Sequence, residues 1–503
     1  MLFTPTIVNN IVGGLGNLLQ ISNILFVLFG TLIGLFVGAM PGLSATMAIA
    51  MLLPLTFNLS AETGISMLAA LYMGAMYGGS ISAILIKTPG TPAAAATILD
   101  GFPMAQKGQA GKALGISLVA STIGGLISGF ALLLIAPLLG NVALQFGPVE
   151  LFAVGVFGMT IIGSLTDKSV MKGLLSGVFG LLIATIGMDT ISGTARFTFG
   201  ILNLYSGIPF TVALIGLFSV PQAIRLSMQN DDEAPITSDV KDRMLPTLKE
   251  LWFLLPTILR SAIIGIFVGL IPGTGGDTAC WYAYNETKRF SKHKELFGTG
   301  LPEGIAAAES ANNAVVGGAL IPTISLGIPG SSATAVLMGG LMVHGIMPGP
   351  TLMTQYANVT YTLIWAVIFS VISMFVMGLL FTRASIFVTR IKNRVLAPII
   401  IILCVIGSFA INNSMFDVIL MFGFGLLGYF MDMIKMPTAP MVLGLILGNL
   451  VETSLYQSLA IGHGSAAIFL SSPIAVVLLA FSALSILQAT PLFNFLRKKR
   501  KTT

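Results

Sequence analysis

Four proline-glycine pairs interrupt long apolar stretches of this chain, and small hydroxyl or glycine residues follow each pair. The four segments are PGLSAT from Pro41, PGTPAA from Pro89, PGTGGD from Pro272 and PGSSAT from Pro329. Proline removes a backbone N–H and glycine permits unusual dihedral angles, so each pair is expected to break a helix. A half-helix that starts after such a break presents free N–H groups and the positive end of its dipole, which favour a carboxylate or phosphate. The expected chemistry is therefore the binding of a small anion.

The candidate substrate-binding residues are the four breaks, the residues that follow them, and one lysine that precedes the second break. They are Pro41, Gly42, Leu43, Ser44, Ala45, Thr46, Lys87, Pro89, Gly90, Thr91, Pro272, Gly273, Thr274, Gly275, Gly276, Pro329, Gly330, Ser331, Ser332 and Thr334. The simpler interpretation is that small residues only allow helices to pack closely. Lys87 either pairs with a substrate carboxylate or extends to the membrane interface.

Three polar residues are candidates for holding a coupling cation. Asp277 is a carboxylate in an otherwise neutral apolar stretch, where charges are costly and usually functional. It either binds Na⁺ with nearby carbonyl groups or carries a proton; the alternative is that it caps a water-exposed helix end. Asn312 and Asn313, next to Glu309, are further candidate oxygen ligands. Apart from the coupling Na⁺ or H⁺, no cofactor or metal site is expected, because the two cysteines form no metal-binding pattern.

Composition predicts an all-α polytopic membrane protein. Of 503 residues, 55% are hydrophobic and only 9% are charged. Long uncharged runs, such as residues 114–149 and 356–382, are sufficient for spanning helices of ~20 residues. The net charge of +6 does not indicate nucleic-acid binding, because its largest cluster is the tail Arg497–Lys501, which is typical of a cytoplasmic anchor. The N-terminus lacks the positive region of a signal peptide, so an uncleaved apolar segment is expected to direct insertion.

The second half of the chain repeats the first. GLFVGAMPGLSATMA (residues 34–48) aligns with GIFVGLIPGTGGDTA (residues 265–279), a shift of 231 (272 − 41). Pro89 aligns with Pro329 at a shift of 240 (329 − 89), and the nine extra residues fall in polar sequence at 288–300. This internal similarity predicts an N-terminal membrane repeat at 1–225, a cytoplasmic polar linker at 226–250 and a C-terminal membrane repeat at 251–503.

The distribution of Lys and Arg predicts that the repeats have opposite orientations. Basic residues at 107–112, 168–172, 225–249, 383–394 and in the tail are assigned to the cytoplasm, which makes the C-terminus cytoplasmic. The span that starts at Leu114 then runs outward, whereas its counterpart, Asn358 to Phe381, runs inward. Two inverted repeats with re-entrant or broken helices that meet near the bilayer midplane are thus expected, an arrangement that permits alternating access.

The segments that contain the breaks resemble a known family. GAMPGLSATMAIAMLLPLTF (residues 38–57), KTPGTPAAAATILDGFPMAQKGQAGKAL (87–114) and GIPGSSATAVLMGGLMVHGIMPGP (327–350) are similar to the large membrane subunit of tripartite tricarboxylate transporters, the TctA family. The resemblance implies a bacterial inner-membrane protein that imports citrate-like tri- or dicarboxylates, driven by a Na⁺ or H⁺ gradient. The implied partners are a small four-helix membrane subunit (TctB-like), a periplasmic solute-binding protein (TctC-like) and the lipid bilayer. A homodimer of this chain is a further alternative.

Two other classes of function were weighed against a secondary transporter. A passive organic-anion channel would use the same anion site without alternating access, and dependence on an ion gradient separates the two. An intramembrane aspartyl protease is suggested by Asp277 in GTGGD, but Thr274 stands where the GxGD pattern has glycine. The sequence also lacks HExxH and GxxxxGK[ST], so no enzyme activity is expected. For transport, the hypothesis is that the broken helices move against the flanking spans by an elevator or rocking movement.

Overall fold

The computed structural model is built almost wholly of helices that form two compact units. It describes residues 5–164, 170–189, 192–228, 242–388 and 393–489. Unit 1 comprises residues 1–141 and 222–407, and unit 2 comprises residues 142–221 and 408–503. Each unit thus takes sequence from both predicted repeats. The predicted boundaries at 225 and 250 stay a prediction, because compactness of a unit is a different property from internal repetition.

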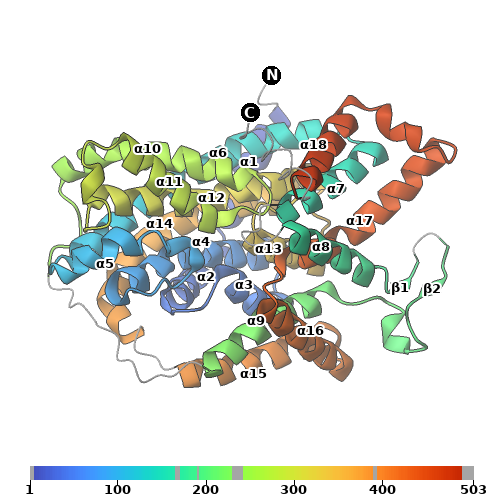
Figure 1. Ribbon diagram of the computed structural model, residues 1–503, viewed down its shortest axis with the longest axis horizontal. Coiled ribbons are helices and arrows are strands. Elements are labelled where there is room, and N and C mark those ends of the chain that lie inside the picture. The colour runs from blue at the N-terminus through green and yellow to red at the C-terminus, as the bar shows by residue number, and fades with distance from the viewer. Residues whose placement is uncertain (1–4, 165–169, 190–191, 229–241, 389–392, 490–503) are drawn as a thin grey trace, which may run out of the picture. The chain divides into compact units, whose positions relative to one another are not determined.

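Unit 1 holds the four breaks, and its chain order is shown in Figure 1. Its elements are α1 (Pro5–Leu18), α2 (Ile21–Ala39), α3 (Ala45–Leu52), η1 (Leu53–Thr56), α4 (Ala61–Ile86), η2 (Pro92–Ala94), α5 (Ile98–Gln106), α6 (Ala110–Ala143), α10 (Leu248–Leu270), α11 (Gly275–Phe290), η4 (Lys294–Leu296), α12 (Pro302–Leu326), α13 (Ser332–Val343), η5 (Pro350–Met353), α14 (Ala357–Val388) and α15 (Asn393–Asn412). Helices α6 and α15 continue for a few residues into the sequence of unit 2, and α9 (Phe210–Met228) begins in the sequence of unit 2 and ends in that of unit 1.

Unit 2 is also helical and contains one small hairpin. Its elements are α7 (Pro148–Ser164), α8 (Val170–Ala184), β1 (Gly187–Met188), β2 (Ala195–Arg196), η3 (Leu202–Leu204), α9 (Phe210–Met228), α16 (Met415–Met433), α17 (Ala439–Ile461), η6 (Ala466–Leu470) and α18 (Pro473–Ala489). The antiparallel strands β1 and β2 pair Gly187 with Arg196. Composition did not predict this hairpin.

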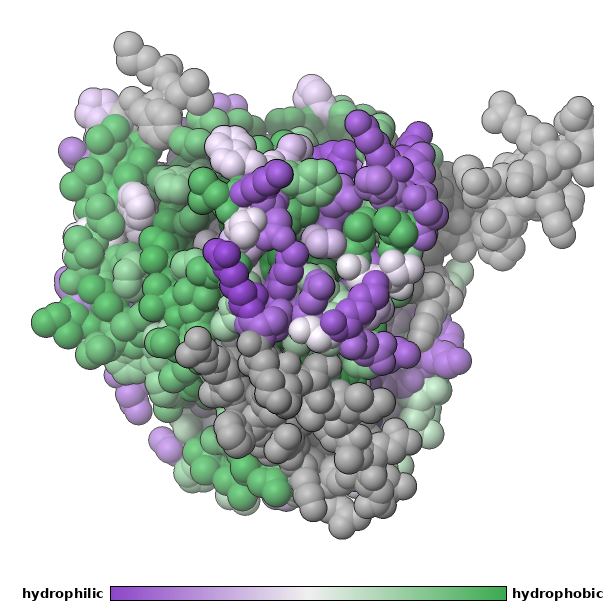
Figure 2. Space-filling view, turned by 90° about the vertical axis from the view of Figure 1, so that its left-hand side faces the viewer, coloured by the Kyte–Doolittle hydropathy of each residue, from purple (hydrophilic) through white to green (hydrophobic). Residues whose placement is uncertain are grey.

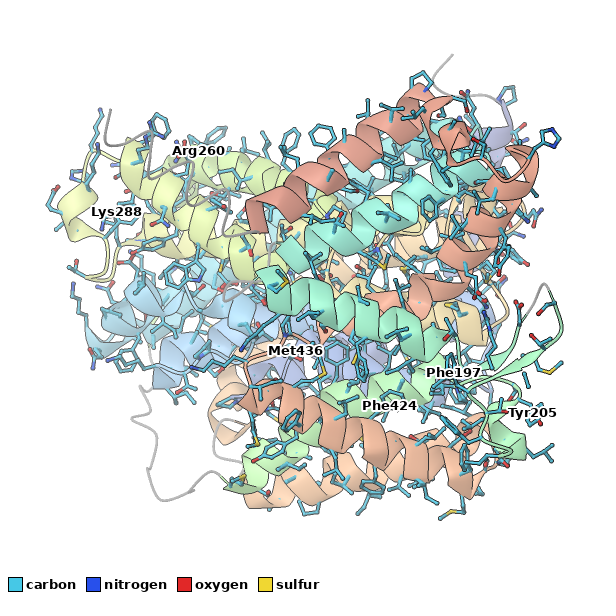
Figure 3. The ribbon with its side chains drawn as sticks, turned by 45° about the vertical axis from the view of Figure 1, so that its right-hand side comes forward. Phe197, Tyr205, Arg260, Lys288, Phe424 and Met436 are labelled. Carbon is cyan, nitrogen blue, oxygen red and sulfur yellow. The ribbon has the colours of Figure 1, made fainter. Side chains whose placement is uncertain are left out.

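The β1–β2 hairpin is tied to helix α17 by ion pairs. The Arg196 guanidinium donates to both carboxylate oxygens of Glu452, over 2.5 and 3.1 Å. This hydrogen bonding raises the pKa of Arg196 above its ordinary value. Figure 3 shows Phe197 and Tyr205 beside this hairpin, and both side chains are exposed.

Among the described residues, nine helices are long and apolar enough to cross a membrane. They are α2, α4, α6, α9, α10, α14, α15, α16 and α17. This confirms the all-α, polytopic part of the predicted fold class. Helix α12 is long enough but more polar, and its residues from Gly304 to Ser325 are all buried. Burial in protein rather than lipid is what makes polar side chains tolerable at such a depth.

Helix pairs α2–α4 and α10–α12 pack through glycine in the same way. A Cβ added at Gly34 would lie 2.3 Å from the Leu71 carbonyl oxygen, and one added at Gly265 would lie 2.4 Å from that of Ala311. The two contacts are related by the shifts seen in the sequence, since 265 − 34 = 231 and 311 − 71 = 240. The repeat is therefore visible in packing as well as in sequence.

The partner helices α4 and α12 contribute glycines to the same two interfaces, and these contacts are related by the same shifts of 231 and 240 residues. Gly78 faces the Leu35 carbonyl oxygen, and Gly318 faces that of Ile266, with 2.6 and 2.7 Å from the added Cβ. Close backbone approach of this kind requires residues without side chains and is typical of helices that pack in membranes.

Helices α4 and α12 run antiparallel where they touch. The amide of Asn312 donates to the Met76 carbonyl (3.0 Å), and the amide of Asn313 donates to that of Met73 (3.3 Å), so the contact moves backward along α4 as it moves forward along α12. Consistently, Leu301 at the start of α12 binds a residue of α5, which follows α4 in the chain.

Asp100 closes one end of unit 1. Its buried carboxylate accepts N–H bonds from Gly298, Gly300 and Leu301 (2.8–2.9 Å) and the hydroxyl of Tyr284 (2.8 Å). These bonds fix the polar 291–301 segment against α5, and Figure 2 shows hydrophilic residues gathered on the side of the protein where these elements lie. The role of Asp100 in the fold is thus structural. The tail Arg497–Lys501, Lys168 and most of the linker lie outside the described residues.

The glycine contacts generate a stability prediction. We expect Gly34→Ala and Gly265→Ala each to destabilise the protein by about 1–3 kcal/mol, because the methyl group overlaps a backbone oxygen that cannot move independently. Gly16→Ala is the matched control: nothing lies within 4 Å of its added Cβ, so the better helix propensity of alanine should leave stability unchanged or raised. Thermal unfolding of the purified protein in detergent measures both. Equal midpoints for all three variants would contradict the packing account.

Candidate functional site

The first and fourth breaks meet through side-chain hydroxyls. Thr46, in the first turn of α3, lies with its Oγ1 2.9 Å from the Oγ of Ser332, the first residue of α13. The hydroxyl of Tyr72, from the middle of α4, lies 3.1 Å from the Oγ of Ser331. These residues come from both halves of the sequence, up to 286 positions apart. The site therefore depends on the fold rather than on any local motif.

The third break joins the fourth through the backbone. The Gly273 N–H donates to the Gly330 carbonyl over 3.0 Å. Gly275 also lies against Ser331, because a Cβ added there would be 3.7 Å from the Ser331 Cβ. The fourth break thus supplies a partner for a backbone N–H that the third break frees, which is how irregular backbone survives in an apolar surrounding.

The second break packs against the first and the third. The Gly90 N–H donates to the Gly79 carbonyl (3.1 Å), and Gly90 lies so close to the Gly38 carbonyl that no Cβ would fit. Gly330 approaches Gly269 in the same way. On the other side, Ala93 of η2 lies against Gly276 of the third break. All four breaks therefore form one neighbourhood in unit 1.

A half-helix was expected after every break, and this is confirmed for three of them. Helices α3, α11 and α13 begin at Ala45, Gly275 and Ser332. The expectation was wrong for the second break, which is followed only by the 3₁₀ turn η2 before α5 begins at Ile98. Pro92 starts that turn without an N–H to donate, and the Thr97 hydroxyl just after the turn donates to a carboxylate of α12.

Two of the hydroxyls expected at the ligand cap their own helices. Ser44 accepts the N–H of Met47 (3.2 Å), and Ser331 forms a capping box with Thr334. Helix α11 differs, because its N-cap Thr274 makes no side-chain cap and donates its hydroxyl to backbone carbonyls before the helix. The dipole end of α11 is thus the one of the three without a hydroxyl cap.

Of the predicted cation ligands, Asp277 stands on α11 near its start, whereas Asn312 and Asn313 stand on α12. Asp277 is in the first turn of α11, is exposed and interacts electrostatically with Tyr72. Asn312 is fully buried, touches Gly276 and has a carbonyl oxygen without a hydrogen-bond partner among the described groups. Asn313 is buried one residue further on, against Met73.

Lys87 and Thr91 occupy the edge of the neighbourhood. Lys87 ends α4 with a left-handed backbone (φ 60°), is exposed and places its ammonium 5.7 Å from the ring centroid of Phe102. Its pairing with substrate stays a prediction. Thr91 is buried against Gly79, and its hydroxyl has no hydrogen-bond partner among the described groups.

Sequence analysis did not include Glu309 in the predicted site. Its side chain is fully buried in α12 and accepts hydroxyl hydrogen bonds from Thr97 (2.5 Å) and from Ser121 of α6 (3.1 Å). A signal was present in the sequence: between Glu303 and Asp417, Glu309 is the only acidic residue. An isolated carboxylate in a long neutral stretch is a functional hypothesis in a membrane protein.

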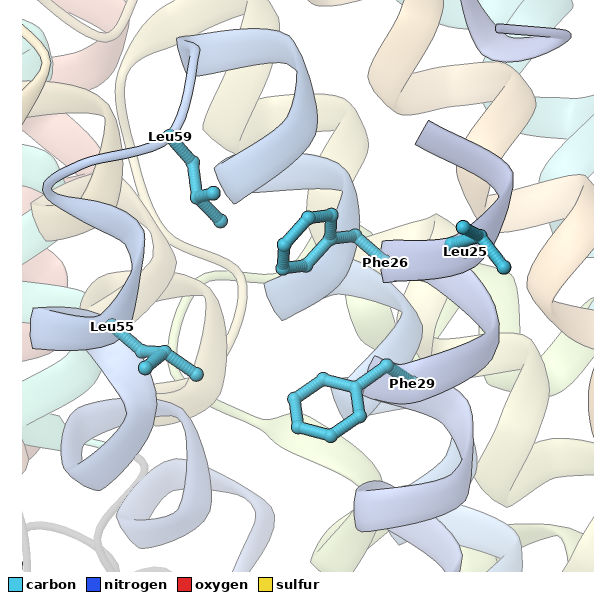
Figure 4. A pocket seen from close by; sticks show the side chains of 5 residues that line it. All are labelled: Leu25, Phe26, Phe29, Leu55 and Leu59. Atoms are coloured by element: carbon cyan, nitrogen blue, oxygen red, sulfur yellow. The ribbon is translucent and has the colours of Figure 1, made fainter. Parts of the chain in front are cut away.

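A pocket elsewhere in unit 1 does not suit an anion. Figure 4 shows it between α2 and the segment that follows α3, with a volume of about 510 Å³. Its lining side chains are all apolar: Leu25, Phe26, Phe29, Leu55 and Leu59. Without a donor or a positive charge it offers a carboxylate no compensation for lost water. The break neighbourhood is the better candidate.

Comparison with known proteins identifies the family. The model of the tripartite tricarboxylate transporter TctA family matches residues 24–443, which include all four breaks. The chain belongs to the TctA family. The resemblance seen in the sequence is thus confirmed, and with the nine apolar helices it makes the chain a multi-pass membrane protein of a transporter family.

Two relatives from Agrobacterium vitis are similar to this TctA-family chain. One, described as an uncharacterized 52.8 kDa protein in the TAR-I ttuC' 3' region, is 36% identical over 498 residues and covers 98% of each chain. Another, described as an uncharacterized protein in the TAR-II ttuC' 3' region, is 34% identical over 236 residues, which is 47% of this chain and 97% of the relative. No solved structure matches the chain.

The contact between breaks one and four generates a binding prediction. We expect Thr46→Val and Ser332→Ala each to raise the KM for carboxylate uptake about tenfold, because one hydrogen bond to a charged group contributes roughly 1.5 kcal/mol. Thr122→Val is the control, since that hydroxyl of α6 bonds only to its own helix, at the Leu118 carbonyl (2.7 Å). Initial uptake rates against substrate concentration provide the measurement. A KM unchanged in both site variants would remove these hydroxyls from the site.

Proposed function

We propose that this TctA-family protein is the large permease subunit of a binding-protein-dependent secondary transporter that imports tri- or dicarboxylates of the citrate type. The observation that carries the proposal is the convergence of four broken segments, from both halves of the chain, on one polar neighbourhood. The hydrogen bond between Thr46 and Ser332 is its clearest expression. Broken helices at corresponding positions of two repeats are typical of a transporter's substrate site.

The charges near α11 support an anionic substrate that moves with a cation. The helix end without a hydroxyl cap favours negative charge, and the hydroxyls of Thr46 and Ser332 add donors. Asp277 already places a carboxylate at that end, so a second anion there is repelled unless positive charge lies between them. Import coupled to Na⁺ or H⁺ supplies that charge. A passive channel has no such requirement.

The antiparallel contact of α4 with α12 supports the hypothesis of inverted repeats. The recurring glycine contacts support it too, since equivalent helices pack in equivalent ways at the same shifts. We propose that alternating access arises when the broken helices move against their flanking spans, by an elevator or rocking movement. We also propose location in the bacterial inner membrane with a cytoplasmic C-terminus.

The family's name supports the proposed partners. It describes a tripartite transporter, and we propose that the other two parts are a small four-helix membrane subunit and a periplasmic solute-binding protein. The binding protein would then deliver the carboxylate to the outer side of the permease and largely set which carboxylate is carried.

Uptake into proteoliposomes tests coupling. We expect the protein with its small subunit, supplied with loaded binding protein, to accumulate a labelled tri- or dicarboxylate under an inward Na⁺ or H⁺ gradient. Asp277→Asn should disrupt the dependence on the gradient, because it removes the carboxylate at the anion's helix end. Glu286→Gln, on the same helix near its other end, is the control.

Two results would contradict the proposal. Uptake that proceeds equally well without any gradient and without the binding protein would indicate a passive channel. Gradient-dependent uptake that is unchanged in Asp277→Asn would remove Asp277 from coupling.

A further inference from the structure

Glu309 has hydrogen-bond donors but no counterion. The Thr97 hydroxyl donates to Oε1 and the Ser121 hydroxyl to Oε2. Among the described residues, no lysine or arginine forms an ion pair with it. A carboxylate removed from water is strongly disfavoured as a free charge, even when hydroxyls surround it. Something that the protein itself does not supply must therefore neutralise this group.

The neighbouring ionisable groups give no compensation. On the elements packed against this part of α12 they are Asp277, Cys280 and Tyr284 of α11, Asp100 of α5, and Tyr72 and Tyr77 of α4. All six lose a proton when they ionise, so none carries positive charge.

Two basic side chains on neighbouring helices are engaged with other groups. The guanidinium of Arg260, on α10, donates to Thr287 and covers the ring of Phe290, and Figure 3 shows Arg260 on the same side of unit 1 as Lys288. Lys112 of α6 pairs with Glu250.

A buried amide oxygen on the same helix as Glu309 has no hydrogen-bond partner among the described groups. One helical turn along α12, the fully buried Oδ1 of Asn312 accepts no hydrogen bond from a described group, although the Nδ2 of the same side chain donates to Met76. A buried acceptor is rarely left unsatisfied unless an ion or water belongs there. The Ser117 hydroxyl of α6 also contacts the carboxylate. Carboxylate, amide and hydroxyl oxygens are the ligands that hard cations prefer.

We infer that Glu309 and Asn312 form the binding site of the coupling monovalent cation, either Na⁺ held by these oxygens or H⁺ held on the Glu309 carboxylate. The inference rests on the proposed function and adds a cation site on α12, while the carboxylate of Asp277 keeps its proposed place at the start of α11. Asn312 touches Gly276 of the third break, so a cation here lies directly behind the helix end proposed for the carboxylate. Occupancy of one site then stabilises occupancy of the other.

The position of Glu309 also makes the two halves unequal. At the shift of 240 residues its counterpart is Ala69 of α4, which is fully buried and apolar (309 − 69 = 240). One cation site is therefore expected per chain, although the breaks themselves occur in pairs.

The test uses Glu309→Gln, which keeps the shape of the side chain and removes its charge. Glu303→Gln, on the same helix but only half-buried, is the matched control. One readout is the thermal midpoint of the purified chain without substrate, titrated with Na⁺ against choline at fixed pH, and with H⁺ in the absence of Na⁺. The other compares gradient-driven accumulation with carboxylate exchange at equal cation on both sides of proteoliposomes.

We expect cation-dependent stabilisation of the wild type and of Glu303→Gln and its loss in Glu309→Gln. Accumulation should fall at least tenfold in Glu309→Gln, whereas exchange, which needs no gradient, should persist. The arm that stabilises the wild type, Na⁺ or H⁺, identifies the cation. Full gradient-driven accumulation or unchanged cation stabilisation in Glu309→Gln would overturn the inference.

The experiment separates failure of the proposed function from failure of the cation site. If the wild type neither accumulates nor exchanges carboxylates, the proposed function fails, while the stabilisation readout still decides the cation site. If Glu309→Gln does not fold, Asn312→Ala takes its place, with an expected tenfold rise in the cation concentration for half-maximal stabilisation. No change in that concentration would again overturn the inference.

Discussion

The structure of unit 1 depends on one constraint: backbone that leaves a helix in an apolar surrounding must find a partner. The breaks satisfy it mutually, since Gly273 donates to the Gly330 carbonyl and Gly90 lies directly on the Gly38 carbonyl. These backbone contacts lie within each half of the chain, whereas the hydroxyl contacts of Thr46 with Ser332 and of Tyr72 with Ser331 join the two halves. The same constraint explains the concentration of glycine, because only residues without a Cβ allow backbones to approach so closely.

The two similar halves that form the break neighbourhood differ in their acidic side chains. Thr46 in the first half corresponds to Asp277 in the second, and Ala69 corresponds to Glu309 (shifts of 231 and 240). Both changes introduce a carboxylate on the same half, near the one helix end that lacks a hydroxyl cap. Similar backbones thus bring the segments together, and in the proposed function the unequal side chains give the anion and the cation separate places.

The sequence predicted the helices and the interruptions between them well, because both depend on local composition. The inverted repeats and their boundaries stay predictions, which the recurring glycine contacts support. The sequence predicted the half-helix after Pro89 wrongly, since that segment is set by a distant partner, the contact of Thr97 with Glu309. Glu309, to which we assign the proposed cation, lies outside the predicted site for the same reason: its surroundings come from α6, α12 and the segment before α5. The caps made by Ser44 and Ser331 were also not foreseen, because hydroxyls after a break suit a helix cap and a ligand equally.

The central claim is that breaks from the two halves form a single carboxylate site. Oxidative cross-linking of Thr46→Cys with Ser332→Cys in membranes tests it most directly, because the replaced hydroxyl oxygens lie 2.9 Å apart, whereas native Cys280 and Cys404 are buried. The account predicts a disulfide that forms in the double variant, in neither single variant, and more slowly when a transported carboxylate is present. Absence of the disulfide, or formation at a rate that no carboxylate changes, would contradict it.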